Sequence, residues 1–172
     1  MAESPKPDTL NHVGVLTRRE IEARIVAPLL ERFGDEFGRE RVVELAAEVI
    51  GDVARSQGAA LAELVGGDDL PDFEASLEAW TRGGALEIDV VEQTPQTFAF
   101  NVTRCRYAEM YRELGLADLG ATLSCNRDGT LIEGFNPRIE FARTQTIMGG
   151  AEYCDFTYRL PEPETPVQLS ER

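Results

Sequence analysis

The sequence predicts an α+β fold, with N-terminal helices packed on a roughly four-stranded antiparallel sheet and two helices inserted between its strands. Up to Trp80, apolar residues recur at three- and four-residue steps, which is typical of amphipathic helices. From Leu86 onward they alternate with polar residues, which is typical of half-buried strands. Helical spacing then returns before the last two predicted strands.

Three helices are expected before the first strand. The first begins at Thr17, which with Glu20 has the spacing of a capping box, and Pro28 should kink or break it before Gly34 or Gly38 ends it. The second ends near Gly58, where a C-terminal glycine is useful. The apolar stripes consist of Ile21, Ile25, Leu29 and Phe33 in the first helix, of Val42, Ala46, Val49 and Val53 in the second, and of Phe73, Leu77 and Trp80 in the third.

The second half of the chain should supply the sheet. Residues 86–90 and 98–102 alternate around a turn at Thr94-Pro95, so they predict an antiparallel hairpin. Residues 107–114 and about 117–124 return to helical spacing, and residues 125–137 read as a long loop because of their Asp-Gly and Asn-Pro pairs. Two final strands are expected at about 138–148 and 151–160.

Composition narrows the class of protein. The 172 residues predict a single domain over residues 1–160, followed by a flexible tail at 161–172. With 17 basic against 31 acidic side chains, the net charge of −14 argues against a nucleic-acid partner. No apolar run is long enough for a membrane helix, and no secretory signal is visible. Three widely spaced cysteines fit reduced thiols and a cytoplasmic location.

The final hairpin places polar groups on its apolar face. A two-residue turn at Gly149-Gly150 would set Gln145 opposite Cys154 and Arg143 opposite Phe156. A buried guanidinium needs a partner, which is either a protein carboxylate such as Asp128 or an anionic ligand. The alternative is an ion pair that only orders the fold, and a one-residue slip in register would turn these groups outward.

The three thiols differ in their expected reactivity. Cys105 lies at a helix start between Arg104 and Arg106, which should lower its pKa, so it is the best thiolate candidate. Cys125 follows a helix, and Cys154 lies on the inward strand face near Arg143. For each thiol the plain alternative is a small buried apolar side chain.

A metal site is not expected from the cysteine spacing. The gaps between the cysteines are 20 and 29 residues, and the chain has neither a Cys-x-x-Cys motif nor a pair of histidines. Because His12 is the only histidine, acid–base chemistry would fall to carboxylates, thiols or water.

An ordered set of short motifs resembles the L-2-amino-thiazoline-4-carboxylic acid hydrolase family. The resemblance covers about residues 98–160. The motifs are Cys105-Arg106-Tyr107-Ala108, Glu113-Leu114-Gly115, Leu119-Gly120, Cys125-Asn126-Arg127-Asp128, Gly134-Phe135-Asn136-Pro137, Arg143-Thr144-Gln145-Thr146 and Cys154-Asp155-Phe156.

This resemblance implies a hydrolase of non-peptide carbon–nitrogen bonds, which opens a cyclic amidine-like ring to N-carbamoyl-L-cysteine without a cofactor. Cys105, Asp128 and Cys154 are then the catalytic candidates, with Cys105 as the nucleophile and Cys154 the next choice. Arg143 is the candidate anchor for the substrate carboxylate. The other candidate substrate-binding residues are Gln145, Asn136 and Cys125.

Three other functions stay open. The first is a ligand-binding or redox- or metal-sensing module whose cysteines are structural or hold a metal. The second is a hydrolase of another cyclic or amidine-containing compound. The third is a protein-interaction domain that uses the helical half, although the helix stripes are expected only to cover the sheet. The expected partner is a small anionic substrate and not a membrane, and homo-oligomerisation is left open.

Overall fold

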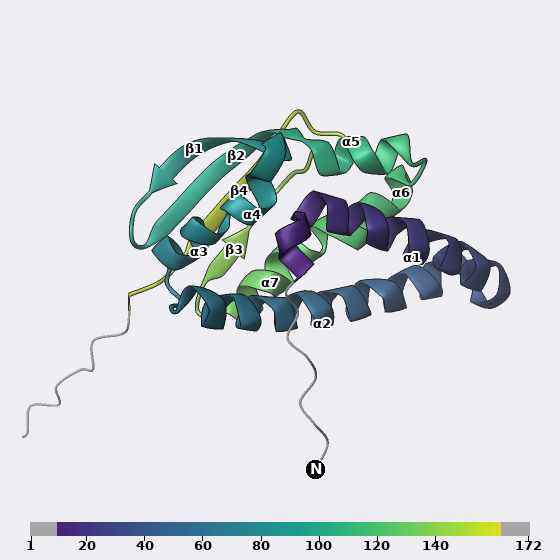
Figure 1. Ribbon diagram of the computed structural model, residues 1–172, viewed down its shortest axis with the longest axis horizontal. Coiled ribbons are helices and arrows are strands. Elements are labelled where there is room, and N and C mark those ends of the chain that lie inside the picture. Colours follow the sequence, from purple (N-terminus) through teal and green to yellow (C-terminus); the bar gives the residue numbers. More distant parts are fainter. Residues whose placement is uncertain (1–9, 163–172) are drawn as a thin grey trace, which may run out of the picture.

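The predicted α+β fold is confirmed by a computed structural model, in which helices cover one face of a four-stranded antiparallel sheet (Figure 1). The structure describes residues 10–162. The N-terminal segment up to residue 9 and most of the predicted tail, from residue 163 onward, lie outside the described residues.

The long helices precede the first two strands, as the change of sequence period predicts. The elements are, in chain order, η1 (Leu10–Val13), α1 (Val15–Phe37), α2 (Arg39–Val65), α3 (Leu70–Ser76), α4 (Glu78–Thr81), η2 (Arg82–Gly84), β1 (Leu86–Gln93), β2 (Thr97–Cys105), α5 (Arg106–Glu113), α6 (Ala117–Gly120), the π-helical turn η3 (Ala121–Cys125), α7 (Arg127–Phe135), β3 (Glu140–Ala142) and β4 (Cys154–Arg159).

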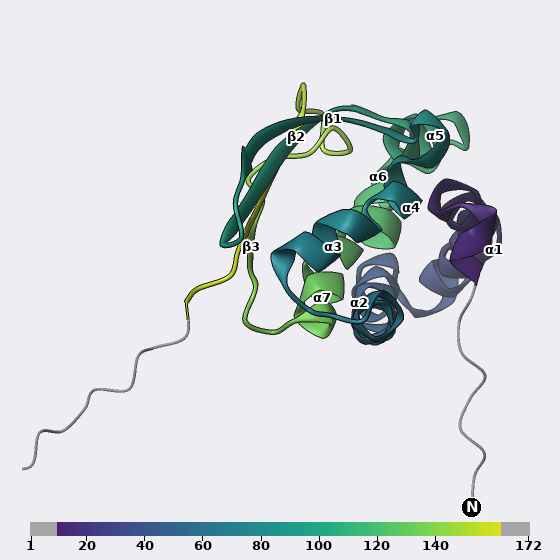
Figure 2. The ribbon, with the colours of Figure 1, turned by 60° about the vertical axis from the view of Figure 1, so that its left-hand side comes forward.

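The sheet has the order β1-β2-β4-β3, with every neighbouring pair antiparallel. The predicted first hairpin is confirmed, and its turn is closed by the Thr94 N–H, which donates to the Thr97 carbonyl at 2.8 Å. Phe98, Phe100 and Val102 alternate along β2 and are buried on the face toward the helices. Figure 2 shows α3 and α7 between this face and the long helices α1 and α2.

The final hairpin has the predicted register but is much shorter than predicted. Glu140 pairs with Arg159, which is the register that a turn at Gly149-Gly150 implies, yet β3 ends at Ala142. The Asp155 carboxylate accepts the backbone N–H groups of Thr144 at 3.0 Å and Gln145 at 2.8 Å. Because this side chain takes donors that a strand ladder would use, residues 143–153 form a loop, and the predicted two-residue turn is wrong.

The predicted long loop at residues 125–137 is also wrong, because most of it is helix α7. Leu131, Ile132 and Phe135 of this helix are buried in the main hydrophobic core beside Tyr158 of the sheet. Burial of this face outweighs the turn preference of Asp128-Gly129, which falls in the first turn of the helix.

The long helices differ from their predicted bounds. Helix α1 begins at Val15 without a side-chain cap and continues through Pro28 to Gly38, whose φ of 92° ends it. Helix α2 continues through Gly58, so this glycine is not its terminus. A Cβ atom at Gly58 would lie 1.9 Å from the carbonyl oxygen of Leu131, and one at Gly134 would lie 1.9 Å from that of Arg55. These two glycines therefore permit close packing of α2 on α7.

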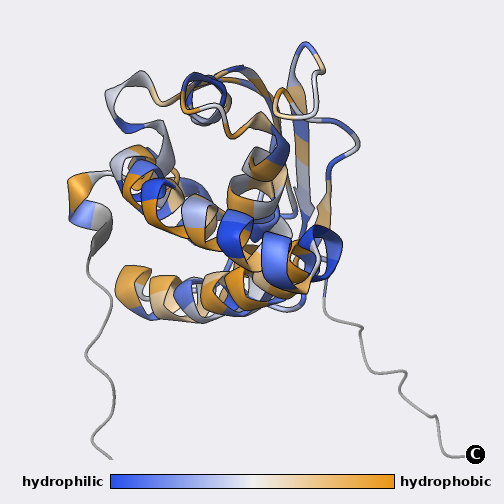
Figure 3. Cartoon of the chain, turned by 90° about the vertical axis from the view of Figure 1, so that its right-hand side faces the viewer, coloured by the Kyte–Doolittle hydropathy of each residue, from blue (hydrophilic) through white to orange (hydrophobic). Residues whose placement is uncertain are grey.

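The predicted apolar stripes of α1 and α2 face solvent to a large extent instead of covering the sheet. Ile21, Ile25 and Leu29 are 54%, 60% and 48% exposed, whereas α1 buries the small side chains of Ala23 and Ala27. Orange segments recur along the long helices in Figure 3. The other exposed apolar residues of these helices are Phe33, Phe37, Leu45, Val49, Val53, Leu64 and Val65. Exposed apolar side chains, of the kind that a protein-interaction domain requires, are therefore present on both long helices.

None of the helices within residues 10–162 combines the length and the hydropathy that crossing a membrane requires.

The close approach of α2 and α7 can be tested with Gly58→Ala. The added methyl group meets backbone and not a flexible side chain, so we expect a loss of about 1–3 kcal/mol in the free energy of unfolding, measured by urea denaturation. Gly51→Ala on the same helix is the control, because its Cβ meets only the side chain of Thr130, whose nearest atom, Cγ2, is 3.4 Å away. That change should be neutral or stabilising by up to about 1 kcal/mol. Equal effects of both changes would contradict the packing role of Gly58.

Candidate functional site

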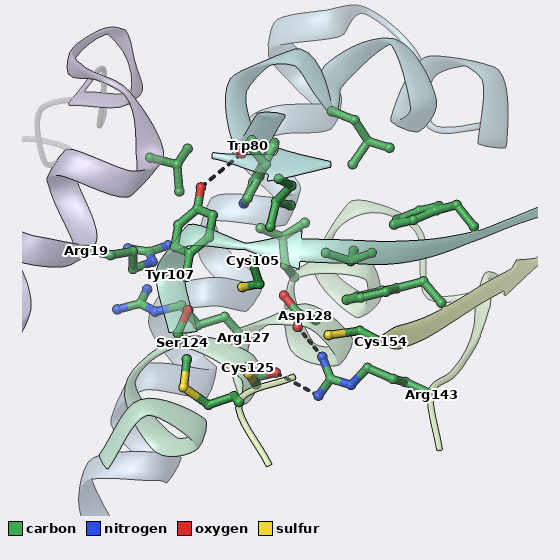
Figure 4. Close-up of a pocket in the computed structure, with 18 of the residues that line it drawn as sticks. Arg19, Trp80, Cys105, Tyr107, Ser124, Cys125, Arg127, Asp128, Arg143 and Cys154 are labelled. Carbon is green, nitrogen blue, oxygen red and sulfur yellow. Dashed lines mark hydrogen bonds and ion pairs between the residues drawn. The ribbon is translucent and has the colours of Figure 1, made fainter. Parts of the chain in front are cut away.

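A cavity of about 100 Å³ lies between the inner face of β2 and β4 and the surrounding helices (Figure 4). For comparison, a buried cavity of about 150 Å³ is enough to hold a benzene ring. Most of its lining is apolar or aromatic, including Phe73, Trp80, Phe100, Leu131 and Phe156. The side chains in its lining that bear charges, thiols or a small hydroxyl are Arg19, Cys105, Ser124, Cys125, Arg127, Asp128, Arg143 and Cys154.

The structure brings five of the seven candidate site residues together at this cavity. Cys105 comes from the end of β2, Cys125 from the end of η3, Asp128 from α7, Cys154 from the start of β4, and Arg143 from the loop after β3. These positions span about 50 residues of sequence, so only the tertiary fold makes them neighbours.

Gln145 and Asn136 do not line the cavity. The Asn136 side chain is 1% exposed, and it donates to the Asp68 carbonyl at 2.8 Å and accepts from the Arg138 N–H at 2.9 Å. It therefore ties the end of α7 to the loop before α3. Gln145 is held through its backbone N–H by Asp155. The expectation that these two residues contact the substrate has no support in this arrangement.

Arg143 has the protein partner that the sequence analysis named. Its Nη1 donates to Asp128 Oδ2, and its Nη2 donates to the carbonyl oxygen of Cys125 at 3.2 Å. The guanidinium also lies over the ring of Phe156, 5.3 Å from its centroid. An ion pair with a carboxylate, which was one of the two open possibilities, thus accounts for the arginine among apolar neighbours.

Asp128 is the carboxylate best suited to acid–base work in the cavity. Burial raises the pKa of the Asp128 carboxyl to about 6, while the positive charge of Arg143 and its hydrogen bond act in the opposite direction. A pKa near 6 leaves the group ionised at neutral pH and still basic enough to accept a proton.

The expectation of a lowered pKa at Cys105 is wrong. Its Sγ caps helix α5 by accepting the Ala108 N–H at 3.4 Å, but burial raises the pKa of the thiol to about 11. The neighbouring arginines do not offset this effect, because both point away from the thiol. Arg104 pairs with Glu87 and Glu109 on the surface, and Arg106 donates to the Gly83 carbonyl.

The other two thiols are also held in the protonated form. Burial raises the pKa of Cys125 to about 12 and also raises that of Cys154. The Ile147 N–H donates to Cys154 Sγ at 3.2 Å and partly opposes this rise. All three cysteines are free, so without a ligand the cavity contains thiols and not thiolates. Within residues 10–162 no group of three or more His, Cys, Asp or Glu side chains is placed to hold a metal ion.

Sequence reasoning missed two arginines of the cavity. Arg19 comes from the first turns of α1, and Arg127 is the first residue of α7. They are only 5% and 8% exposed. Arg127 stands next to Asp128 in a quoted motif, but the loop predicted there concealed that both residues begin a buried helix. Arg19 lies in the segment read as a capping box, which would have placed it on a helix surface.

Comparison with known families gives one match. A model of the L-2-amino-thiazoline-4-carboxylic acid hydrolase family matches residues 18–158. This range includes all the polar residues of the cavity. No curated protein matches the chain.

Solved structures of low sequence identity share the fold, among them these two. One is the phenol-responsive sensory domain of the transcription activator PoxR with phenol, at 14% identity and a TM-score of 0.50, covering 78% of this chain and 72% of that one. The other is a trafficking protein particle complex subunit 3 from Naegleria fowleri covalently bound to palmitic acid, at 10% identity and a TM-score of 0.50, covering 85% of this chain and 96% of that one.

The electrostatic coupling of Arg143 to Asp128 predicts a measurable titration. Because Arg143 favours the charged carboxylate, Arg143→Met should raise the pKa of Asp128 above its starting value of about 6. The ¹³C chemical shift of the carboxyl carbon, followed by NMR against pH, reports this value. Arg159→Met serves as the control, since Arg159 is exposed on β4 and does not line the cavity. An unchanged or lowered titration midpoint of Asp128 in Arg143→Met would show that the ion pair between the two residues is not formed in solution.

Proposed function

Because the chain belongs to the L-2-amino-thiazoline-4-carboxylic acid hydrolase family, we propose that it is a hydrolase that opens a small cyclic amidine carboxylate to an N-carbamoyl amino acid. The observation that carries this proposal is the convergence of Cys105, Cys154, Asp128 and Arg143 on one small cavity (Figure 4). A nucleophile, a base and a group that orients the base are the parts that hydrolytic chemistry needs.

The size and lining of the cavity support a compact substrate. A volume of about 100 Å³, smaller than the roughly 150 Å³ cavity that holds benzene, restricts the ligand to a compact molecule, and the aromatic lining surrounds it with apolar side chains. Three free thiols also support a reducing compartment such as the cytoplasm.

In the proposed first step, the Asp128 carboxylate accepts the proton of the Cys105 thiol, and the sulfur attacks carbon 2 of the protonated thiazoline. A protonated amidine ring brings a positive charge beside the thiol, which lowers a thiol pKa. The raised pKa of Cys105, about 11, therefore does not prevent attack when this ligand lies beside the thiol. Arg143 holds the carboxylate of Asp128 in position throughout.

Ring opening and hydrolysis follow with balanced atoms. The bond between carbon 2 and the ring sulfur breaks, and Asp128 returns its proton to that sulfur, which becomes the free thiol of the product. The carbon stays attached to Cys105 as an isothiourea. Water, deprotonated by Asp128, then adds to this carbon, and the Cys105 sulfur leaves and regains a proton. The net change is the addition of one water molecule to the substrate.

A second candidate function is a ligand-binding module that senses a small molecule. The observation that favours it is the largely apolar lining of the cavity. The two proteins of similar fold are described with phenol and with covalently bound palmitic acid. Saturable binding of the aminothiazoline carboxylate without any turnover would support this candidate over the hydrolase.

Cys105→Ala is expected to reduce the rate of product formation from the aminothiazoline carboxylate at least about a hundredfold, since it removes the nucleophile. Mass spectrometry of the carbamoyl product gives the rate. Mass spectrometry of acid-quenched protein should show an adduct equal to protein plus intact substrate, mapped to Cys105. Cys125→Ala is the control, because it removes a thiol of the same cavity that takes no part in the proposed attack.

Full rate in Cys105→Ala would refute this nucleophile. An adduct on Cys154 would transfer the role to that residue. If the wild-type protein neither turns over the aminothiazoline carboxylate nor is thermally stabilised by it, this compound is excluded as the substrate.

The role of Asp128 as a base predicts a pH dependence. A base must be unprotonated to act, so kcat/KM should rise with pH and level off above the pKa of Asp128, which is about 6 in the free protein. Asp128→Asn should lower kcat/KM and remove this rising limb, as measured from initial rates between pH 4 and 8. Glu133→Gln is the control, because Glu133 is an exposed carboxylate on the same helix outside the cavity. A rising limb that persists in Asp128→Asn would assign the titration to another group.

A further inference from the structure

The cavity has a second charged region in addition to the Asp128–Arg143 pair. Arg19 from α1 and Arg127 from α7 both line it, and in Figure 4 they lie together on the side away from Arg143 and Cys154. Cys105 and Asp128 lie between these two sides in the same view. The cavity is therefore cationic at one end and carries Cys154 and Arg143 at the other, with Cys105 and Asp128 between them.

The positive charge at this end is not balanced by its carboxylate. Arg19 Nη1 and Arg127 Nη2 both contact the same oxygen of Glu22, Oε2, at 2.7 and 2.9 Å. The second oxygen, Oε1, is 2.9 Å from Arg18 Nε. Burial opposes ionisation of Glu22, but Arg19, Arg18 and Arg127 together leave its pKa lowered, so it is fully charged at neutral pH. Two buried guanidinium groups thus share one carboxylate oxygen, which among the described residues of the cavity leaves an excess of positive charge.

Arg127 also has an unused donor. Its Nε donates to the Leu123 carbonyl at 3.0 Å and its Nη2 to Glu22, whereas Nη1 is buried and has no hydrogen-bond partner among the described residues. Leaving a charged donor unpaired away from water costs free energy. Consistent with this, burial and the adjacent Arg19 lower the pKa of Arg127 to about 10. A bound anion would give Arg127 Nη1 a hydrogen-bond acceptor and would also offset the excess positive charge of the two arginines.

Arg143 is less suited to this task than the sequence suggested. Its two terminal nitrogens already donate to Asp128 and to the Cys125 carbonyl, and Asp128 neutralises its charge. A substrate carboxylate placed there would also lie next to the carboxylate of Asp128, which repels it.

We propose that Arg127 and Arg19 form the anion subsite of the cavity, which binds the carboxylate of the substrate and directs its amidine end to Asp128 and Cys105. The substrate class is then a small molecule with a carboxylate at one end and a protonated amidine at the other. The identity of this ligand rests on the proposed function, whereas the anion subsite itself does not.

The test compares 2-aminothiazoline-4-carboxylate with its carboxamide, which has the same shape without the charge, by isothermal titration calorimetry of protein that also carries Cys105→Ala, so that the proposed ring opening does not take place during the titration. With Arg19, Arg127 and Arg143 unchanged, this protein should bind the carboxylate about tenfold or more tightly than the carboxamide, as a charged hydrogen bond requires. Arg127→Met should lose most of this preference and keep its affinity for the carboxamide. Arg159→Met, at an exposed arginine outside the cavity, is the matched control and should keep the preference. Circular dichroism checks that each variant is folded, and Arg127→Lys, which keeps the charge, should retain part of the preference.

A second probe separates this subsite from the choice of substrate. Acetate, at the same ionic strength as a chloride control, should raise the Tm of the wild-type protein more than acetamide does, and this difference should vanish in Arg127→Met. If acetate stabilises the protein in this way but the aminothiazoline is not turned over, the anion subsite stands and the proposed hydrolase fails. The subsite is overturned if the preference survives in Arg127→Met and disappears in Arg143→Met. It is also overturned if protein with both arginines intact binds the carboxylate no more tightly than the carboxamide and gains no more in Tm from acetate than from acetamide.

Discussion

The ion pair between Arg143 and Asp128 is the contact on which the candidate site depends. It joins the loop after β3 to the first turn of α7. This loop leads to Cys154, and α7 follows Cys125, so the ion pair sets the distance between two segments that each adjoin a cavity thiol. Either partner alone would be an uncompensated charge among phenylalanine rings and thiols, which is far more costly than the pair. The pair therefore holds a basic carboxylate in the same cavity as Cys105 and Cys154, among largely apolar neighbours.

The position of α7 determines how both ends of the cavity are charged. Arg127 and Asp128 are successive residues at its start, and successive side chains on an α-helix point about 100° apart. One helical turn thus directs a cation to one part of the cavity and an anion to another. This placement relies on the close packing of α7 against α2, where Gly58 and Gly134 remove the side chains that would separate the helices.

The interior of the site has a charge opposite to that of the whole chain. The protein carries a net charge of −14, yet the cavity lining contains three arginines and one aspartate. Its thiols are held protonated by burial, and a protonated thiol is a poor nucleophile. Under the proposed mechanism the bound substrate supplies the positive charge that activates Cys105. The site would then become reactive only when it is occupied.

Local patterns in the sequence were sufficient for the fold class and for much of the sheet. The alternation in residues 86–90 and 98–102 predicted β1 and β2, because a strand with one buried face imposes that period directly. The register of β3 against β4 was also predictable. The length of β3 was not, because the Asp155 side chain takes up the backbone donors that would have continued the strand.

Tertiary packing decided which helix face is buried and which residues meet. Amphipathic spacing predicted that α1 would bury Ile21 and Ile25, but the structure buries Ala23 and Ala27 against neighbouring helices and leaves the larger residues exposed. The same limit applies to the site. The motifs identified Cys105, Cys125, Asp128, Arg143 and Cys154, whereas Arg19 joined them only through the packing of α1. A sequence pattern records the preferences of neighbouring residues along the chain. Burial, the pKa values and the charge of a cavity arise instead from groups that are distant in sequence and that only the folded chain brings into contact.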